Sequence, residues 1–169
     1  MLRRRLVLFG LPLLAVGCAG TRGGGSRSGR TVPGYEGGGG QSCVPFARQR
    51  SGIGLRGDAW QWWSEAEGRY ARGGAPRPGS VLVFARTARL RTGHLSVVSR
   101  VISGREILVD HANWAPAGTG ARGMVARDQP VQDISDAGDW SVLKVWYPPA
   151  GNFGQTPYPA WGFIHSARA

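Results

Sequence analysis

Four side chains in this sequence are of the types that carry out nucleophilic catalysis: Cys43, His94, His111 and Asn113. A thiol beside an imidazole can lose its proton to the ring and then attack a carbonyl carbon. A further polar group that hydrogen-bonds the histidine holds its ring in the tautomer that accepts this proton. Together these residue types predict acyl transfer through a thioester.

Cys43 stands at the predicted start of a short helix. Ser42 is a favourable N-cap residue, and Pro45 fits the first turn, where its missing N–H costs no hydrogen bond. A helix N-terminus offers free backbone N–H groups and the positive end of the helix dipole, which lower the pKa of a thiol. We therefore expect a Cys43 thiolate paired with His94, and N–H groups available to an oxyanion.

The second cysteine, Cys18, follows a segment typical of a signal peptide. Three arginines precede an apolar run at 6–16, which is too short to span a bilayer permanently. The end of this segment, Leu-Ala-Val-Gly-Cys at 14–18, resembles a bacterial lipobox, whose cysteine is lipidated and becomes the first mature residue. Lipidation would leave Cys43 without a partner; an ordinary signal peptide and a Cys18–Cys43 disulfide are the alternatives.

Composition divides the chain into four segments: a lipoprotein-type signal peptide (1–17), a Gly-rich tether (18–40), a globular domain (41–147) and a C-terminal tail (148–169). The chain holds 28 Gly and 11 Pro, but its hydrophobic content of 41% is enough for one core. Basic residues outnumber acidic ones 21 to 10, and they are scattered rather than gathered on one face. With no nucleic-acid motif present, we expect anionic lipid or wall polymers as partners, and no nucleic acid.

The hydrophobic period predicts helices first and strands afterwards. A helix begins at Cys43 and a second at Asp58, where Asp58 and Gln61 fit a capping box. Four strands follow, at 80–85, 93–102, 105–113 and 141–147, with a turn at 103–104 between the second and the third. Short turns indicate antiparallel neighbours, so the pattern predicts an α+β fold with N-terminal helices packed on an antiparallel sheet.

The predicted hairpin brings the two histidines together. Alternation along the strand at 105–113 puts His111 and Asn113 on one face and Asp110 on the other. Pairing about the turn at 103–104 places His94 near position 113. We therefore expect His94, His111 and Asn113 at one end of the sheet, with Asp110 pointing away.

The motifs around these residues resemble a CHAP domain, the cysteine, histidine-dependent amidohydrolase/peptidase family. They are Ser-Cys-Val-Pro-Phe-Ala-Arg at 42–48, Asp-Ala-Trp at 58–60, Arg-Pro-Gly-Ser-Val-Leu-Val-Phe at 77–84, Thr-Gly-His-Leu-Ser-Val-Val at 92–98 and His-Ala-Asn-Trp at 111–114. The resemblance covers residues 41–147 and implies a papain-like α+β fold. It also implies a peptidoglycan amidase or peptidase with Cys43 as nucleophile and His94 as general base.

One position departs from the family's pattern. The family often has an acidic residue two positions before Asn113, where this chain has His111. A carboxylate would stabilise an imidazolium by charge, whereas a neutral histidine can only accept a hydrogen bond from it. We expect His111 to orient His94, with Asn113 as the second candidate and Asp110 as the third. Trp62 and Trp114 are predicted to bind substrate.

The sequence thus predicts an exported, lipid-anchored thiol hydrolase of the bacterial cell envelope, held through Cys18 and facing the periplasm. It would cleave peptidoglycan as an N-acetylmuramoyl-L-alanine amidase or an endopeptidase. No cofactor is expected, and no metal site, because no zinc-ligand spacing of His and Cys occurs. The alternative is a catalytically degenerate module that binds or assembles peptidoglycan, and the sequence does not define an oligomeric state.

Overall fold

A computed structural model describes residues 34–37, 40–115 and 121–166. The predicted signal peptide, Cys18 and most of the tether lie outside the described residues. Tyr35 and Glu36, assigned to the tether by composition, contact the sheet: Tyr35 is buried in a cluster with Met124, and Glu36 pairs through its backbone with Val125. Within the described ranges, no helix is long and apolar enough to cross a membrane.

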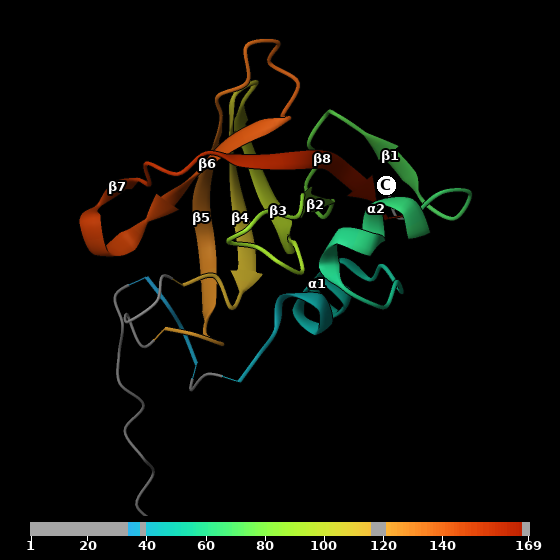
Figure 1. The fold of residues 1–169 in the computed structure, drawn as a ribbon, viewed down its shortest axis with the longest axis horizontal. Coiled ribbons are helices and arrows are strands. Elements are labelled where there is room, and N and C mark those ends of the chain that lie inside the picture. Colours follow the sequence, from blue (N-terminus) through green and yellow to red (C-terminus); the bar gives the residue numbers. More distant parts are fainter. Residues whose placement is uncertain (1–33, 38–39, 116–120, 167–169) are drawn as a thin grey trace, which may run out of the picture.

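Strands make up most of the described fold, and the helices are short (Figure 1). The α-helices are α1 (Cys43–Ser51) and α2 (Trp62–Glu65), and 3-10 turns lie at Ala59–Gln61 and Pro148–Ala150. The strands are β1 (Ala71–Gly73), β2 (Val81–Phe84), β3 (His94–Ser103), β4 (Glu106–Ala112), β5 (Val125–Asp133), β6 (Val142–Tyr147), β7 (Asn152–Phe153) and β8 (Tyr158–His165).

The sheet closes on itself through β8. Its strand order is β1-β8-β2-β3-β4-β5-β6-β7, with antiparallel neighbours and an additional pairing between β8 and β6. Phe163 of β8 pairs with Leu82 of β2, while Tyr158 at the start of β8 pairs with Leu143 of β6. One strand therefore joins both sides of the sheet into a barrel-like ring.

The predicted α+β, papain-like class, with N-terminal helices packed on a sheet, is wrong. Over the described residues, the structure is a mostly β, barrel-like sheet with two short α-helices. Residues 158–165, which the sequence leaves in the tail, form β8 and close the ring. Pro159 and Gly162 interrupt the alternation that would reveal this strand. Gly162 has a φ of 122°, and a Cβ there would lie 2.7 Å from the Gly73 oxygen, so a glycine lets β1 approach β8.

The two faces of the sheet bury different clusters. The helices gather on one side of the ring (Figure 1), so neighbouring residues of one strand pack into separate cores. The face under α1 and α2 includes Ala47, Trp62, Val83, Leu95 and Val97. The interior of the ring includes Leu82, Val109, Val131, Leu143 and Phe163.

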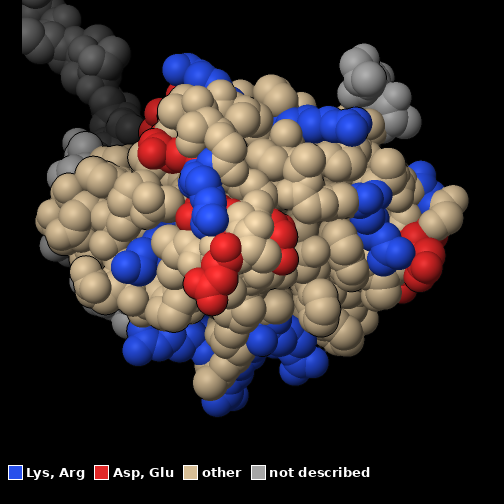
Figure 2. Space-filling view, turned by 90° about the horizontal axis from the view of Figure 1, so that it is seen from above, with Lys and Arg blue, Asp and Glu red and all other residues tan. Residues whose placement is uncertain are grey.

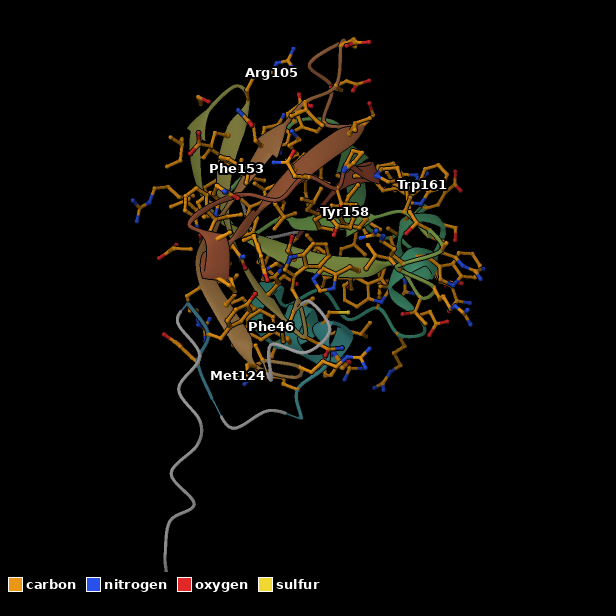
Figure 3. The ribbon with its side chains drawn as sticks, turned by 60° about the vertical axis from the view of Figure 1, so that its left-hand side comes forward. Phe46, Arg105, Met124, Phe153, Tyr158 and Trp161 are labelled. Atoms are coloured by element: carbon orange, nitrogen blue, oxygen red, sulfur yellow. The ribbon has the colours of Figure 1, made fainter. Side chains whose placement is uncertain are left out.

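The two ends of the sheet also differ. Figure 3 shows Arg105, in the turn between β3 and β4, at one end, and Phe46 of α1 with Met124 near the other. Ala112, the last residue of β4, clusters with Phe46 and Val125. The end of β4 that carries His111 is therefore the end where α1 lies.

Candidate functional site

A cleft of about 860 Å³ opens at the α1 end of the sheet. Cys43 and His94 both line it, so the predicted nucleophile and the predicted base share one solvent-accessible space. Its aromatic lining comes from Trp114, Trp146, Tyr147 and Tyr158. Tyr158, which Figure 3 labels, is one of these lining residues and forms part of the cleft wall.

Cys43 is the first residue of α1 and carries a free, half-buried thiol. Ser42 occupies the N-cap position as expected, although its side chain makes no capping hydrogen bond. Burial raises the pKa of the Cys43 thiol, and backbone hydrogen bonds at Leu95, Cys43 and Val44 oppose this only in part. Desolvation thus outweighs the helix N-terminus, and the resting form at neutral pH is the thiol rather than the expected thiolate.

His94 begins β3 and points into the ring, where it is only 3% exposed. The glycine before it, Gly93, has a φ of 69°, and a Cβ there would lie 2.9 Å from the Trp60 nitrogen. The chain therefore needs a glycine to enter β3 at this point. Burial holds the pKa of His94 well below its ordinary value, and the neighbouring His111 lowers it further. His94 is neutral near pH 7.

A hydrogen-bond chain leads from His94 into the interior of the ring. His94 Nε2 lies 3.2 Å from His111 Nδ1, and His111 Nε2 lies 2.5 Å from Gln129 Oε1. Gln129 Nε2 in turn donates to the backbone oxygen of Trp146. We refer to His94, His111 and Gln129, with the Trp146 carbonyl, as the inner relay.

The inner relay fixes the proton positions, because its last group can only accept. The Trp146 carbonyl requires the amide nitrogen of Gln129, which leaves Gln129 Oε1 to accept from His111 Nε2–H. A neutral His111 then accepts at Nδ1 the hydrogen of His94 Nε2–H. His94 Nδ1 remains without a proton, so it is the nitrogen free to act as a base.

His111 is fully buried and stays neutral with its partners. Burial lowers its pKa to about 4, while the hydrogen bond with Gln129 and the charge of Asp110 oppose the shift. The raised pKa of the Cys43 thiol and the lowered pKa values of both imidazoles favour neutral groups at rest over a thiolate–imidazolium pair. Among the described residues, no hydrogen bond joins Cys43 to His94; such contacts often tighten only when substrate binds.

Asn113 lines the cleft, but its side chain is committed to the backbone. The residue has a φ of 61°, and its Oδ1 accepts a hydrogen bond of 3.0 Å from the Gly123 nitrogen. Asn113 thus holds the turn after β4, and the contact with the His94 ring comes from His111 instead. Asp110 lies on the other face, as alternation along β4 predicts, where it binds Arg50 and Arg127.

The two predicted substrate-binding tryptophans lie in different places. Trp114 lines the cleft and contacts both imidazoles, with ring centroids 4.6 Å from His94 and 5.5 Å from His111. Trp62, the first residue of α2, is fully buried in the core, so the prediction that it binds substrate is wrong. A 3-10 turn at Ala59–Gln61 replaces the expected α-helix and rotates Trp62 inward, which leaves Trp60 and Trp63 half-exposed.

The residue that sequence reasoning missed is Gln129. It sits on β5, a strand hidden by Pro130 and by charged residues at 127–128, and a bulge opposite His111 sets its position. The spacing of Gln129, Val131 and Asp133 is the alternation that would have revealed an inward-facing strand. Within 34–37, 40–115 and 121–166, no group of three or more His, Cys, Asp or Glu is placed to hold a metal ion.

A comparison with known protein families covers the candidate catalytic residues of this cleft. The family model of the CHAP domain matches residues 33–113, a span that includes Cys43, His94 and His111. The family is generally hydrolytic, with cysteine- and histidine-dependent amidohydrolase or peptidase activity, and it implies peptidoglycan as the substrate. No curated protein matches the chain significantly.

Proposed function

We propose that this chain, which belongs to the CHAP domain family, cleaves amide bonds of peptidoglycan through an acyl-enzyme on Cys43. The observation that carries the proposal is the cleft itself. A free thiol and an imidazole both line it, and Nε2 of that imidazole is hydrogen-bonded to His111. His94 Nδ1 is thereby left to take the thiol proton.

In the first half-reaction, the Cys43 sulfur attacks the carbonyl carbon of the amide while its proton passes to His94 Nδ1. A C–S bond forms, and the carbonyl oxygen becomes an oxyanion. The backbone N–H groups at the start of α1 are hydrogen-bond donors of the type that stabilises such a charge. The C–N bond then breaks, and His94 returns the proton to the leaving amine. Proton transfer accompanies attack because both groups are neutral at rest.

In the second half-reaction, water replaces the amine. His94 Nδ1 takes a proton from the water, and the oxygen attacks the thioester carbon. The C–S bond breaks, the carboxylic acid leaves, and the sulfur recovers its proton from His94. The inner relay keeps the His94 ring in the same tautomer at the start of both half-reactions.

Mass spectrometry of released wall fragments tests the proposal and identifies the bond. We expect wild-type protein to release fragments from purified peptidoglycan, and Cys43→Ala to release none. A new free amine on the stem peptide, with a free lactyl carboxyl group on N-acetylmuramic acid, would identify an N-acetylmuramoyl-L-alanine amidase. New peptide termini would identify an endopeptidase. Equal release by both proteins would contradict the proposal.

Two observations favour a second candidate, a module that binds peptidoglycan without cleaving it. The raised thiol pKa and the absence of a carboxylate beside His94 both weaken the stabilisation of charged intermediates. This candidate predicts that wild-type and Cys43→Ala proteins sediment equally with peptidoglycan and that neither releases fragments. Fragment release that depends on Cys43 would exclude it.

We also propose that the chain is exported and anchored by lipid at Cys18, facing the periplasm. The support is the charged and apolar pattern of residues 1–17 and the lipobox-like end of that segment. Mass spectrometry of the mature N-terminus in cells tests this. A diacylated Cys18 is the expected result, and an unmodified chain that begins elsewhere would contradict it.

A further inference from the structure

The charged residues of the cleft are all basic. Arg89, Arg91 and Arg122 line it together with Cys43 and His94, and no aspartate or glutamate does. All ten acidic residues of the chain lie within the described ranges, so the missing carboxylates are not hidden elsewhere. The lining of the space that must hold the substrate therefore carries three positive charges and no negative one, although the charge of Asp58, outside the lining, acts on Cys43.

Two of these arginines lie on a firmly built loop, residues 85–93, between β2 and β3. Thr87 Oγ1 accepts hydrogen bonds from the backbone nitrogens of Arg89 and Leu90, at 3.2 and 3.0 Å. Arg86 donates to the backbone oxygen of Arg91 at 2.9 Å, and its guanidinium lies 4.9 Å from the centre of the Trp60 ring. The backbone that carries Arg89 and Arg91 is thus held in place before any ligand binds.

The cleft arginines also differ from other arginines in their partners. In the described part of the chain, Arg50, Arg72, Arg105 and Arg127 form ion pairs with carboxylates. Arg89 donates only to the hydroxyl of Thr156, at 3.3 Å, and no carboxylate lies within 4.0 Å of the three cleft arginines. Their charge is therefore available to an anionic ligand.

Surface charge alone would not locate a ligand. Figure 2 shows basic side chains spread around one face of the molecule, with acidic side chains in smaller groups among them. The position of the three arginines beside the nucleophile is what distinguishes them. An anionic group of the substrate can therefore reach the arginines while its amide lies at Cys43.

We propose that Arg89, Arg91 and Arg122 bind free carboxylate groups of the peptide stem, and that the substrate is peptidoglycan whose stem carboxylates are not amidated. This inference rests on the proposed function, because it assigns a substrate class to the same cleft. A guanidinium matches a carboxylate with two parallel hydrogen bonds, whereas an amide offers one acceptor and no charge. Phosphate-bearing wall polymers share the negative charge, but they lack the amide that must lie at Cys43.

Binding to the Cys43→Ala protein tests the inference without requiring chemistry. The probes are two soluble muropeptides that differ only in free or amidated stem carboxylates. We expect the free form to bind about 10- to 100-fold more tightly, as charge-assisted hydrogen bonds predict. Adding Arg89→Gln, Arg91→Gln and Arg122→Gln together should bring the two affinities to within about threefold, while adding Arg100→Gln on β3, outside the cleft lining, should leave the preference intact.

Two results would overturn the inference: equal affinity for both muropeptides, or a preference that survives in the triple arginine variant. Binding of a phosphate polymer that depends on the same arginines, with no muropeptide preference, would also overturn it. The proposed function fails separately, if wild-type protein releases no fragments from either form. Hydrolysis of both forms at the same kcat/KM would leave the proposed function standing and would contradict the carboxylate assignment.

Discussion

Asp110 and His111 are neighbours on β4, yet they lie in opposite environments. Asp110 faces outward, where it accepts from Arg50 at 2.8 Å, from Arg127 at 3.3 Å and from the Asp128 nitrogen at 3.0 Å. His111 faces into the ring, where its partners are His94 and Gln129, and none carries a charge at neutral pH. We refer to Asp110 with Arg50 and Arg127 as the outer ion cluster.

Because these two side chains point in opposite directions, the Asp110 carboxylate does not contact His94. Burial raises the pKa of Asp110, but the Asp128 backbone and the two arginines lower it more, so the carboxylate stays ionised. An ionised group inside the ring would need comparable partners, and the surrounding valines, leucines and aromatics offer none. The interior instead holds a neutral relay that directs a proton without stabilising a charge.

The largest expected effect comes from breaking the inner relay at its centre. His111→Leu fills similar space but leaves His94 Nε2–H without an acceptor, so the ring no longer has a fixed tautomer. We expect kcat to fall by about 10²- to 10⁴-fold, the range seen for the loss of a base and its orienting group. Steady-state hydrolysis of soluble muropeptides measures it, with circular dichroism to confirm folding. A loss below about threefold would show that His94 needs no orienting partner.

The next effect is on stability against acid. The folded pKa of His111 is about 4, below the ordinary value near 6.5, so the unfolded chain binds a proton first as pH falls. Stability is therefore full above pH 6.5 and decreases between 6.5 and 4, by about 3 kcal/mol for this group. The lowered pKa values of His94 and His165 act in the same direction. Urea unfolding at pH 7, 6 and 5 measures how the free energy of unfolding changes with pH. A free energy that does not change over this range would contradict the burial of neutral histidines.

A smaller effect is expected from the outer ion cluster. Asp110→Asn removes the charge that pairs with two half-exposed arginines, and we expect a loss of about 1–2 kcal/mol in the free energy of unfolding at pH 7. Because the folded pKa of Asp110 is lowered, its stabilisation persists above the ordinary carboxyl range and is lost only as pH falls below it. Between pH 6.5 and 4, the free energy of unfolding of the variant should change with pH as it does in wild type. Its kcat should stay within about threefold of wild type. A collapse of kcat would place Asp110 in the catalytic machinery.

The smallest effect is a shift in a pH profile. Gln129→Glu places a carboxylate at the end of the inner relay, which favours protonation of His111 and so blocks the acceptor of His94 Nε2–H. We expect the acid limb of kcat/KM to move upward by about one pH unit, with a smaller change at pH 8. Gln129→Met, which adds no charge, should lower activity without moving the limb. If the acid limb of kcat/KM lies at the same pH in wild type, Gln129→Glu and Gln129→Met, the inner relay has no part in catalysis.

Local sequence patterns predict some strands of the fold correctly but miss the pairing that closes the ring. Strong alternation gives the strands at 80–85, 93–102, 105–113 and 141–147 within one or two residues, and the hairpin places His94 beside His111. The pairing of β8 with both β2 and β6 is a long-range contact that no local pattern of Pro159 and Gly162 encodes, so the fold class is wrong.

The candidate site shows the same division between local and long-range information. The position of Cys43 at a helix start is local and is predicted correctly. Its protonation state depends on burial against β3, so the expected thiolate is not found. Gln129 reaches His111 only across a bulge in β5. The segment before Trp62 is a 3-10 turn, so the spacing of an α-helix assigns Trp62 to the wrong face.

The central claim is that His94 is neutral at rest and carries its proton on Nε2, which leaves Nδ1 free to accept the proton of Cys43. Nitrogen NMR of protein labelled at its histidines tests this directly at pH 7. We predict one protonated and one bare nitrogen for His94 and for His111, with Nε2 protonated in both rings. A doubly protonated His94 that becomes neutral in Cys43→Ala would reveal a resting thiolate–imidazolium pair and contradict the account.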